Sequence, residues 1–167
     1  MPNKVYFAQE SVTSFGPGGA AASLTTFLMR TVANGAGSVS SVLDRGAGSA
    51  SPLLRWQAQM RSDTTPTAGV ATRFYLVTGQ DGTNHDGGFS SLGSATVSTE
   101  SSFLNATFLG SVIAERGVAL NDLIRSGLVE CRSRYVMVGM WNAMGVSSSN
   151  TTTDSFFRLD PVPDEIQ

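Results

Sequence analysis

The chain has 167 residues, of which 41% are hydrophobic and only 14% charged, with a formal net charge of -2. The charged share is well below the roughly one quarter typical of soluble domains, so uncharged polar residues must cover the surface, and the length suits one domain. Lys4 is the only lysine and the arginines are spread singly, so the chain has no clustered positive charge that would gather nucleic acid.

The cysteine count and the distribution of apolar residues indicate the cellular compartment in which the protein is made. Cys131 is the only cysteine, which excludes an intrachain disulfide and a cysteine-ligated metal site. We expect it to be an inert packed residue, because free cysteine is usually buried. Residues 1–10 lack the apolar core of a secretory signal, and no stretch approaches 18 consecutive apolar residues. The sequence therefore predicts synthesis in the cytoplasm and no contact with a membrane.

The first part of the chain is rich in Gly, Ala and Ser and gives weak structural signals. Short strands are expected at 4–7 and 10–15, and the apolar spacing in 23–32 fits either a strand or a helix face. A further candidate strand, 39–43, lies between small-residue breaks and suggests a hairpin or a flap. We therefore predict that residues 1–52 form an extended, irregular N-terminal region.

The signal becomes stronger after this region. Leu54, Trp56, Ala58 and Met60 alternate with polar residues, which predicts a strand with one buried face. Residues 69–78 carry apolar side chains on both faces, which predicts a central strand.

The remaining chain alternates between turns and strands. A loop is expected from Gly79 to Gly88, where glycine and polar turn residues are dense. Strands are predicted at 95–99, 106–114, 135–141 and 155–159. In the second of these, alternation places Phe108, Gly110 and Val112 on one face.

One segment favours a helix. Between Glu115 and Gly127, the residues Leu120, Leu123 and Ile124 have helical spacing, and Gly127 would end the helix. A short helical connection or a loop packed against the sheet would explain this pattern.

Together these elements predict an all-β fold. Eight to ten strands at roughly regular spacing, with one short helix and an irregular N-terminal arm, are typical of a two-sheet β-sandwich or jelly roll. We expect residues 1–167 to form a single β-sandwich domain.

The residues needed for catalysis are scarce. His85 is the only histidine and so the only imidazole base for a Ser-His-Asp hydrolase, and no Gly-x-Ser-x-Gly motif is present. We therefore expect no enzyme activity, no catalytic residue and no cofactor.

Two binding alternatives remain open. Asp81, Asn84 and Asp86 lie in one glycine-rich loop and are a weak candidate for a calcium site, although their spacing does not match an EF-hand. A carbohydrate-binding module would need exposed aromatic residues, whereas Trp56 and Trp141 alternate in phase with core residues. Turn formation and core packing are the simpler explanations.

The C-terminal two-thirds of the chain, 56–167, resembles the small jelly-roll proteins of tailed-bacteriophage heads known as decoration or cement proteins. The similarity lies in the order of four segments, which are 74–82, 108–112, 134–142 followed by Gly145, and 159–165. None of these segments is a catalytic signature. Residues 1–52 have no counterpart in this resemblance.

The resemblance implies a homotrimer on the exterior of a capsid, with the major capsid protein as partner and an extended N-terminal arm that reaches a neighbour. The expected function is therefore decoration or cementing of a bacteriophage head. Another virion component, such as a tail tube, tail terminator or fibre, is the first alternative. A carbohydrate- or calcium-binding module is the second.

Overall fold

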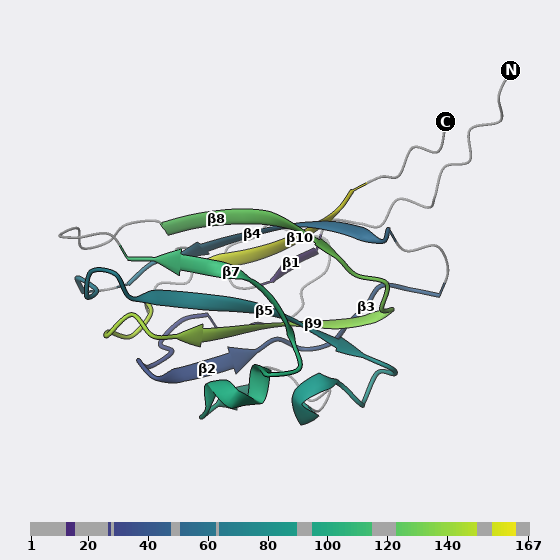
Figure 1. The fold of residues 1–167 in the computed structure, drawn as a ribbon, viewed down its shortest axis with the longest axis horizontal. Helices are drawn as coiled ribbons and strands as arrows, with labels where there is room; N and C mark the ends of the chain where they lie inside the picture. The colour runs from purple at the N-terminus through teal and green to yellow at the C-terminus, as the bar shows by residue number, and fades with distance from the viewer. Residues whose placement is uncertain are drawn as a thin grey trace, which may run out of the picture.

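Two antiparallel sheets pack face to face in the computed structural model (Figure 1). The structure describes residues 13–15, 27, 29–47, 51–62, 64–89, 95–114, 123–149 and 155–162. In sheet A the strand order is β1 (Thr13–Phe15), β10 (Phe156–Pro161), β4 (Leu53–Met60) and β8 (Leu123–Glu130). In sheet B the order is β6 (Ala95–Val97), β2 (Ala36–Val39), β9 (Tyr135–Asn142), β5 (Ala71–Gly79) and β7 (Thr107–Ile113), and β3 (Leu43–Asp44) also pairs with β9. The predicted all-β sandwich is confirmed.

The alternation predicted for β4 places its apolar residues between the sheets. Trp56 is 3% exposed and Met60 is fully buried, whereas Arg55 on the other face is exposed. The Trp56 ring stacks on Phe157 of β10 at 6.2 Å between centroids, and Phe74 of β5 lies 5.6 Å from the same Phe157. Residues from both sheets thus share one core.

Strand β5 is buried on both faces, as predicted for a central strand, and β9 beside it is buried on both faces as well. One face of β9, with Val136, Val138 and Met140, joins the core between the sheets. The opposite face, with Met137 and Trp141, belongs to a second apolar cluster on the outer side of sheet B. A second layer must therefore cover that outer side.

Residues 27 and 29–47, within the region predicted to be extended and irregular, join the sandwich. Phe27, Met29 and Val32 are buried in the core, and β2 and β3 both hydrogen-bond to β9. They form one interrupted strand rather than a hairpin. Ser40, between them, accepts a hydrogen bond on its hydroxyl from the Val138 amide at 2.9 Å. Of the two early strands, only 13–15 is described, as β1, and residues 1–12 lie outside the description.

The predicted helix near Gly127 is also wrong. Residues 123–130 form β8, which pairs with β4 along its whole length, and Gly127 lies in mid-strand opposite Trp56. A Cβ atom at Gly127 would come within 2.8 Å of Nε1 of Trp56. The glycine therefore provides space for an indole ring and does not cap a helix. Residues 115–122 lie outside the described part of the chain.

A β-bulge changes the predicted faces of β7. Phe74 pairs with Gly110 and the next residue, Tyr75, pairs with Phe108, so Leu109 is the extra residue on β7. Paired residues in a sheet share a face, and the bulge therefore turns Phe108 outward with Tyr75 while Gly110 points inward. The predicted alternation, with Phe108 on the same face as Gly110, is wrong for this reason.

Strand β10 extends to Pro161, which pairs with Leu54 at the end of the strand. The next amide, that of Val162, donates a hydrogen bond to the carbonyl oxygen of Leu53 at 2.9 Å, so the contact with β4 continues past the proline. Among the described residues, no helix is long and apolar enough to cross a membrane.

Candidate functional site

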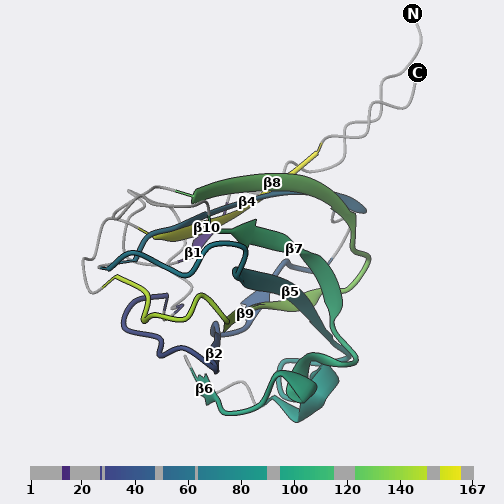
Figure 2. The ribbon, with the colours of Figure 1, turned by 60° about the vertical axis from the view of Figure 1, so that its left-hand side comes forward.

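The outer face of sheet B is covered by a segment that connects β5 to β7 (Figure 2). We call its described residues, 80–89 and 95–106, the strap. The strap contains η1 (Asp86–Gly88), β6 and η2 (Glu100–Phe103). Its apolar side chains Phe89, Val97 and Phe103 pack on the second cluster of the sheet. The strap is thus the layer that buries the outer faces of β5 and β9.

Phe103 is the centre of this contact. It is 2% exposed, and its ring stacks on Tyr75 at 4.6 Å with an interplanar angle of 4°. The ring lies over the backbone of Gly139 and Gly37, and a Cβ atom at Gly139 would overlap it. At Gly139 the strand therefore carries glycine where the strap inserts an aromatic ring, whereas at Gly37 a Cβ atom would first meet the carbonyl oxygen of Met140 at 2.5 Å.

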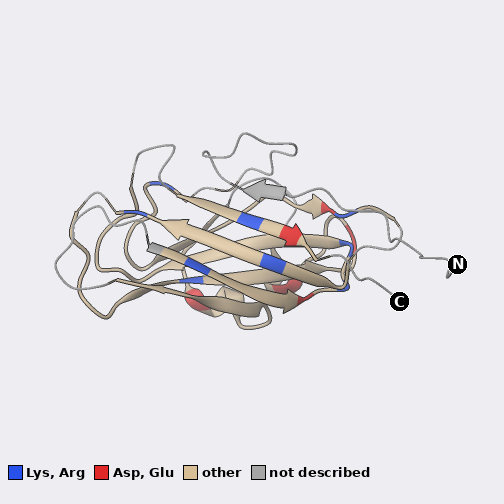
Figure 3. Cartoon of the chain, turned by 90° about the horizontal axis from the view of Figure 1, so that it is seen from above, with Lys and Arg blue, Asp and Glu red and all other residues tan. Residues whose placement is uncertain are grey.

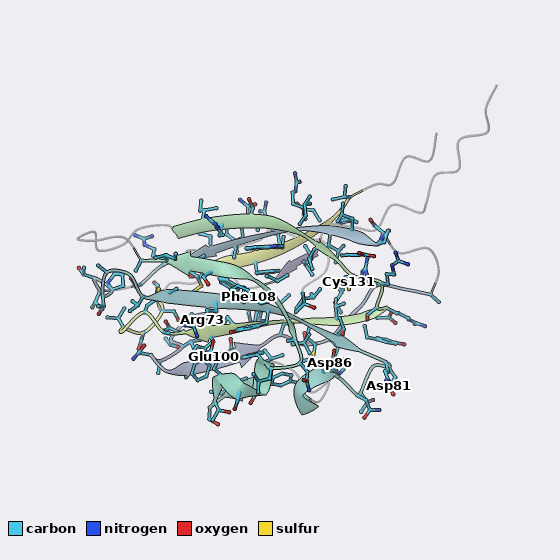
Figure 4. The ribbon with its side chains drawn as sticks, in the orientation of Figure 1. Arg73, Asp81, Asp86, Glu100, Phe108 and Cys131 are labelled. Atoms are coloured by element: carbon cyan, nitrogen blue, oxygen red, sulfur yellow. The ribbon has the colours of Figure 1, made fainter. Side chains whose placement is uncertain are left out.

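A polar group clamps the strap beside this ring (Figure 4). The Arg73 guanidinium donates hydrogen bonds to both carboxylate oxygens of Glu100, at 2.5 and 2.6 Å, and the Tyr75 hydroxyl donates to Oε1 at 2.7 Å. Arg73 and Tyr75 lie on β5, whereas Glu100 lies on η2. The three side chains therefore join the strap to the sheet.

The clamp changes the proton affinity of its members. Partial burial acts to raise the pKa of Glu100, but the hydrogen bonds and charge of its two partners outweigh it, and the pKa lies below its usual value. Burial, followed by the nearby Glu100 carboxylate, raises the pKa of Tyr75 to about 12. At neutral pH the clamp thus holds an ionised glutamate and a neutral tyrosine.

The calcium candidates lie in the strap loop but do not converge (Figure 4). Asp81 accepts hydrogen bonds from the backbone amides of Thr83 and Asn84 at 2.7 Å, and its other oxygen accepts from the Asn84 side chain. Asp86 points to the hydroxyl of Thr78 on β5. Among the described residues, no group of three or more His, Cys, Asp or Glu side chains is arranged to hold a metal ion.

His85 has a packing role in the same loop. It forms an isolated bridge with Gly79, is 9% exposed, and its Nδ1 lies 3.2 Å from the carbonyl oxygen of Phe89. A Cβ atom at Gly79 would lie 2.9 Å from Nε2 of His85, so the imidazole faces the backbone of β5. Within the described chain it therefore lacks the arrangement of a general base beside a nucleophile.

Cys131 is 4% exposed and belongs to the core between the sheets. Its carbonyl oxygen accepts a hydrogen bond from Arg45 at 2.9 Å, and the same guanidinium reaches the carbonyls of Ser133 and Ser51. This cysteine is thus surrounded by packed side chains and backbone, and its expected burial is confirmed.

The exposed apolar surface is concentrated in one stretch of sequence. Among the described residues, five large apolar side chains are exposed, and these five lie between residues 104 and 128: Leu104 (81%), Phe108 (55%), Ile113 (58%), Ile124 (56%) and Leu128 (63%). They belong to β7, to β8 and to the turn that leads into β7. We call these five residues the flank.

The two strands of the flank are neighbours. β7 is an edge strand of sheet B, β8 is an edge strand of sheet A, and they lie side by side where the two sheets meet (Figure 1, Figure 2). Trp56 fills the space behind them, in contact with Gly110 of β7 and Gly127 of β8. The Trp56 indole therefore fills the inner side of the seam between β7 and β8, and the outer side of this seam is exposed to solvent.

The rest of the outer face of sheet A is polar. Arg55 pairs with Asp160 at 3.0 Å, and the Arg158 guanidinium lies 5.0 Å from the ring of Phe156. Charged residues of both signs are scattered over this face (Figure 3). Ile124 and Leu128 of the flank pair with residues of this polar face, whereas Leu104 of the flank belongs to the strap.

Sequence reasoning missed the clamp and the flank. Arg73 and Glu100 are 27 residues apart, and no pattern joins them before the strap is folded onto β5. Phe108 was expected to share the face of Gly110, and Ile124 was expected on a helix. The sequence shows that the second half of the chain is rich in apolar residues, but it does not show which face of each strand they occupy.

No family model matches the chain, and neither a curated protein nor a solved structure shows significant similarity to it. Its function is therefore inferred from its own side chains.

Proposed function

We propose that this chain is a structural protein of a bacteriophage virion that decorates or cements the head, and that it acts by binding other proteins. The observation that carries the proposal is the flank, a set of large apolar side chains exposed on two edge strands of a β-sandwich and on the turn before one of them. Exposed apolar surface of this kind is typical of protein-binding sites. Residues 56–167, which carry the resemblance to head decoration proteins, include the whole flank.

The polar side chains support a binding role over a chemical one. Each carboxylate that the structure describes is engaged within the chain, in an ion pair, a turn or a hydrogen bond to Thr78. The described histidine and cysteine are buried. A carboxylate held by such contacts, or a side chain buried away from any substrate, is a poor acid, base or nucleophile. We therefore propose no catalytic activity.

The surface composition also suits assembly. Protein interfaces are depleted in lysine and glutamate and keep arginine and aromatic residues. This chain has one lysine, whereas its flank carries Phe108 and its sheet A carries Arg55 and Arg158. The proposed partners are other copies of the chain and the major capsid protein, on the exterior of the capsid.

Electron microscopy tests this proposal. Gold-labelled antibodies raised against the purified chain are applied to intact particles from the cells that express it. Label over the heads of tailed particles is the expected result. Label confined to tails would favour a tail-tube, tail-terminator or fibre component, and the absence of label from every particle would contradict a virion role.

A second experiment measures binding directly. The purified chain is added to heads that lack it, and bound protein is separated by sedimentation. Saturable binding is expected, with a number of copies set by the symmetry of the capsid. A Phe108→Ser variant should bind more weakly, and a Thr83→Ser variant in the strap loop is the matched control.

A further inference from the structure

We infer that the flank is the surface through which copies of this chain bind one another. The inference rests on the proposed structural function and adds the site and the partner: a second copy that buries Ile113, Ile124 and their neighbours. Four features of the flank support it: the alignment of β7 with β8, the bulge in β7, the exposed apolar area and the small number of unpaired charges nearby.

The alignment of the two strands brings their apolar residues together. β7 ends at the end of the sandwich where β8 begins, so the strands run in opposite directions (Figure 1). Gly110 and Gly127 touch the same indole ring, and Ile113 and Ile124 each lie three residues from these glycines toward that end. Ile113 and Ile124 therefore lie near the same end of the two neighbouring strands, each on the outer face of its sheet.

The bulge in β7 adds Phe108 to this surface. Without an extra residue at Leu109, strand alternation would turn Phe108 into the core, as it does Gly110 and Val112. Instead the Phe108 ring lies 5.7 Å from Tyr75 on the outer face and remains 55% exposed. A bulge that places an aromatic ring in solvent brings no gain in core packing, and burial by a partner would supply one.

The exposed area approaches that of a stable interface. With about 200 Å² of accessible surface for a large apolar side chain, the recorded exposures amount to on the order of 600 Å² over the flank. A typical stable interface buries about 800 Å² on each partner. Polar residues beside the flank, such as Ser111 and Ser126, supply the remainder.

The charge near the flank favours a second copy over a charged partner. The ionised groups nearby are already paired: Arg73 with Glu100 and Glu130 with Arg132. Arg125 of β8 is the one exposed charge on these two strands with no ion pair among the described residues. Two copies of a surface that is apolar and nearly uncharged do not repel each other.

The backbone edges argue against an added peptide strand. Strand addition requires a free row of amide and carbonyl groups on an edge strand. β7 and β8 instead turn their free edges toward one another across Trp56. Recognition at the flank must therefore use side chains, as in the packing of two folded surfaces.

Sedimentation equilibrium of the full chain tests the inference. The wild-type protein should show a weight-average mass that rises above 17.5 kDa with concentration. Ile113→Arg and Ile124→Arg place a charge in the proposed contact and should weaken self-association by at least about tenfold, which is about 1.4 kcal/mol. Thr96→Arg, an exposed position on β6 at the opposite edge of sheet B, is the matched control and should associate like the wild type.

Circular dichroism and thermal unfolding verify that each variant is folded. If an arginine variant loses its cooperative unfolding, Leu128→Ser decides in its place, because it removes apolar area without adding charge. Wild-type protein that stays at 17.5 kDa, or flank variants that associate as strongly as the wild type, would overturn the inference. A monomer that still labels heads in electron micrographs would overturn only the inference and leave the proposed function standing.

Discussion

The ring of Phe103 lies against Gly139 and occupies the space that a side chain at this position of β9 would fill. Gly139 is not among the glycines with positive φ, so its backbone conformation is open to other residues. What the position requires is the absence of a Cβ atom. The strap is therefore held on the sheet because a central strand carries glycine where the Phe103 ring packs.

Gly139→Ala should destabilise the protein by about 1–3 kcal/mol, because the added methyl group overlaps a fully packed aromatic ring. Urea unfolding followed by circular dichroism measures the change in the free energy of unfolding. Gly82→Ala is the matched control, since the nearest atom to its Cβ would be Cε1 of Tyr135 at 3.7 Å, an ordinary contact. In a Phe103→Ala background the cost of Gly139→Ala should largely disappear. An equal cost in both backgrounds would show that the ring is not the cause.

Glu100→Gln should remove part of the acid sensitivity of the fold. The pKa of Glu100 is lowered in the folded chain, so its stabilising contribution is present above its unfolded pKa and is lost as the pH falls through the folded value. Because both partners of the ion pair are partly exposed, the loss at neutral pH should be only about 1 kcal/mol. Thermal unfolding between neutral pH and pH values below 4.5, the usual pKa of Glu100, measures it.

Wild type and Glu100→Gln should differ most at neutral pH and converge in acid. Glu130→Gln is the control, because its ion pair with Arg132 lies in solvent and joins no separate elements. A difference between wild type and Glu100→Gln that stays constant across this range would contradict the assigned role of the carboxylate.

Ionisation of Tyr75 should lower the stability of the fold at high pH. Its pKa is raised to about 12 in the folded chain, against about 10 for an ordinary tyrosine. The stabilisation is therefore fully present below the unfolded pKa and is lost as the pH rises through the folded value. Spectrophotometric titration of tyrosinate should show one late ionisation in the wild type that Tyr75→Phe abolishes and Glu100→Gln moves to lower pH. A late ionisation that persists in Tyr75→Phe would assign it to another tyrosine.

Calcium should leave the thermal stability unchanged. Asp81 already accepts three hydrogen bonds inside its loop, and Asp86 points to Thr78. A cation would have to replace these contacts before it gained any carboxylate ligand. Melting temperatures in millimolar calcium and in chelator should therefore agree. A clear rise in calcium that is lost in Asp81→Asn would restore the loop as a calcium site.

Strands with strong alternation were predictable from sequence because burial alone sets their pattern. β4 is buried on one face, and β5 and β9 are buried on both, which matches their apolar residues. For β9, however, the sequence did not show what covers the second face. That cover is the strap, whose short elements have no periodicity of their own.

The errors on β7 and β8 have a common physical origin, because both are edge strands. Ile124 and Leu128 on β8 face solvent, so apolar residues do not mark the inner face there, and helical spacing arises by chance. On β7 a single extra residue, Leu109, reverses the faces on its two sides. Alternating apolar residues predict the buried face of a strand only where the exposed face carries polar residues and the pairing with the next strand is regular. The flank breaks both conditions, which is why the exposed apolar residues were not identified.

The indole of Trp56 should report on the closed seam between β7 and β8. Gly127→Ala would place a Cβ atom within 2.8 Å of Nε1 of Trp56, and the ring cannot retreat because it stacks on Phe157. We expect a loss of about 1–3 kcal/mol in the free energy of unfolding and a shift in tryptophan fluorescence as the packing around the ring changes. Ser126→Ala, on the outer face of the same strand, should change neither measurement. Unchanged fluorescence and stability in Gly127→Ala would mean that β8 is free to move away from β7, and that the flank is not the rigid surface on which self-association depends.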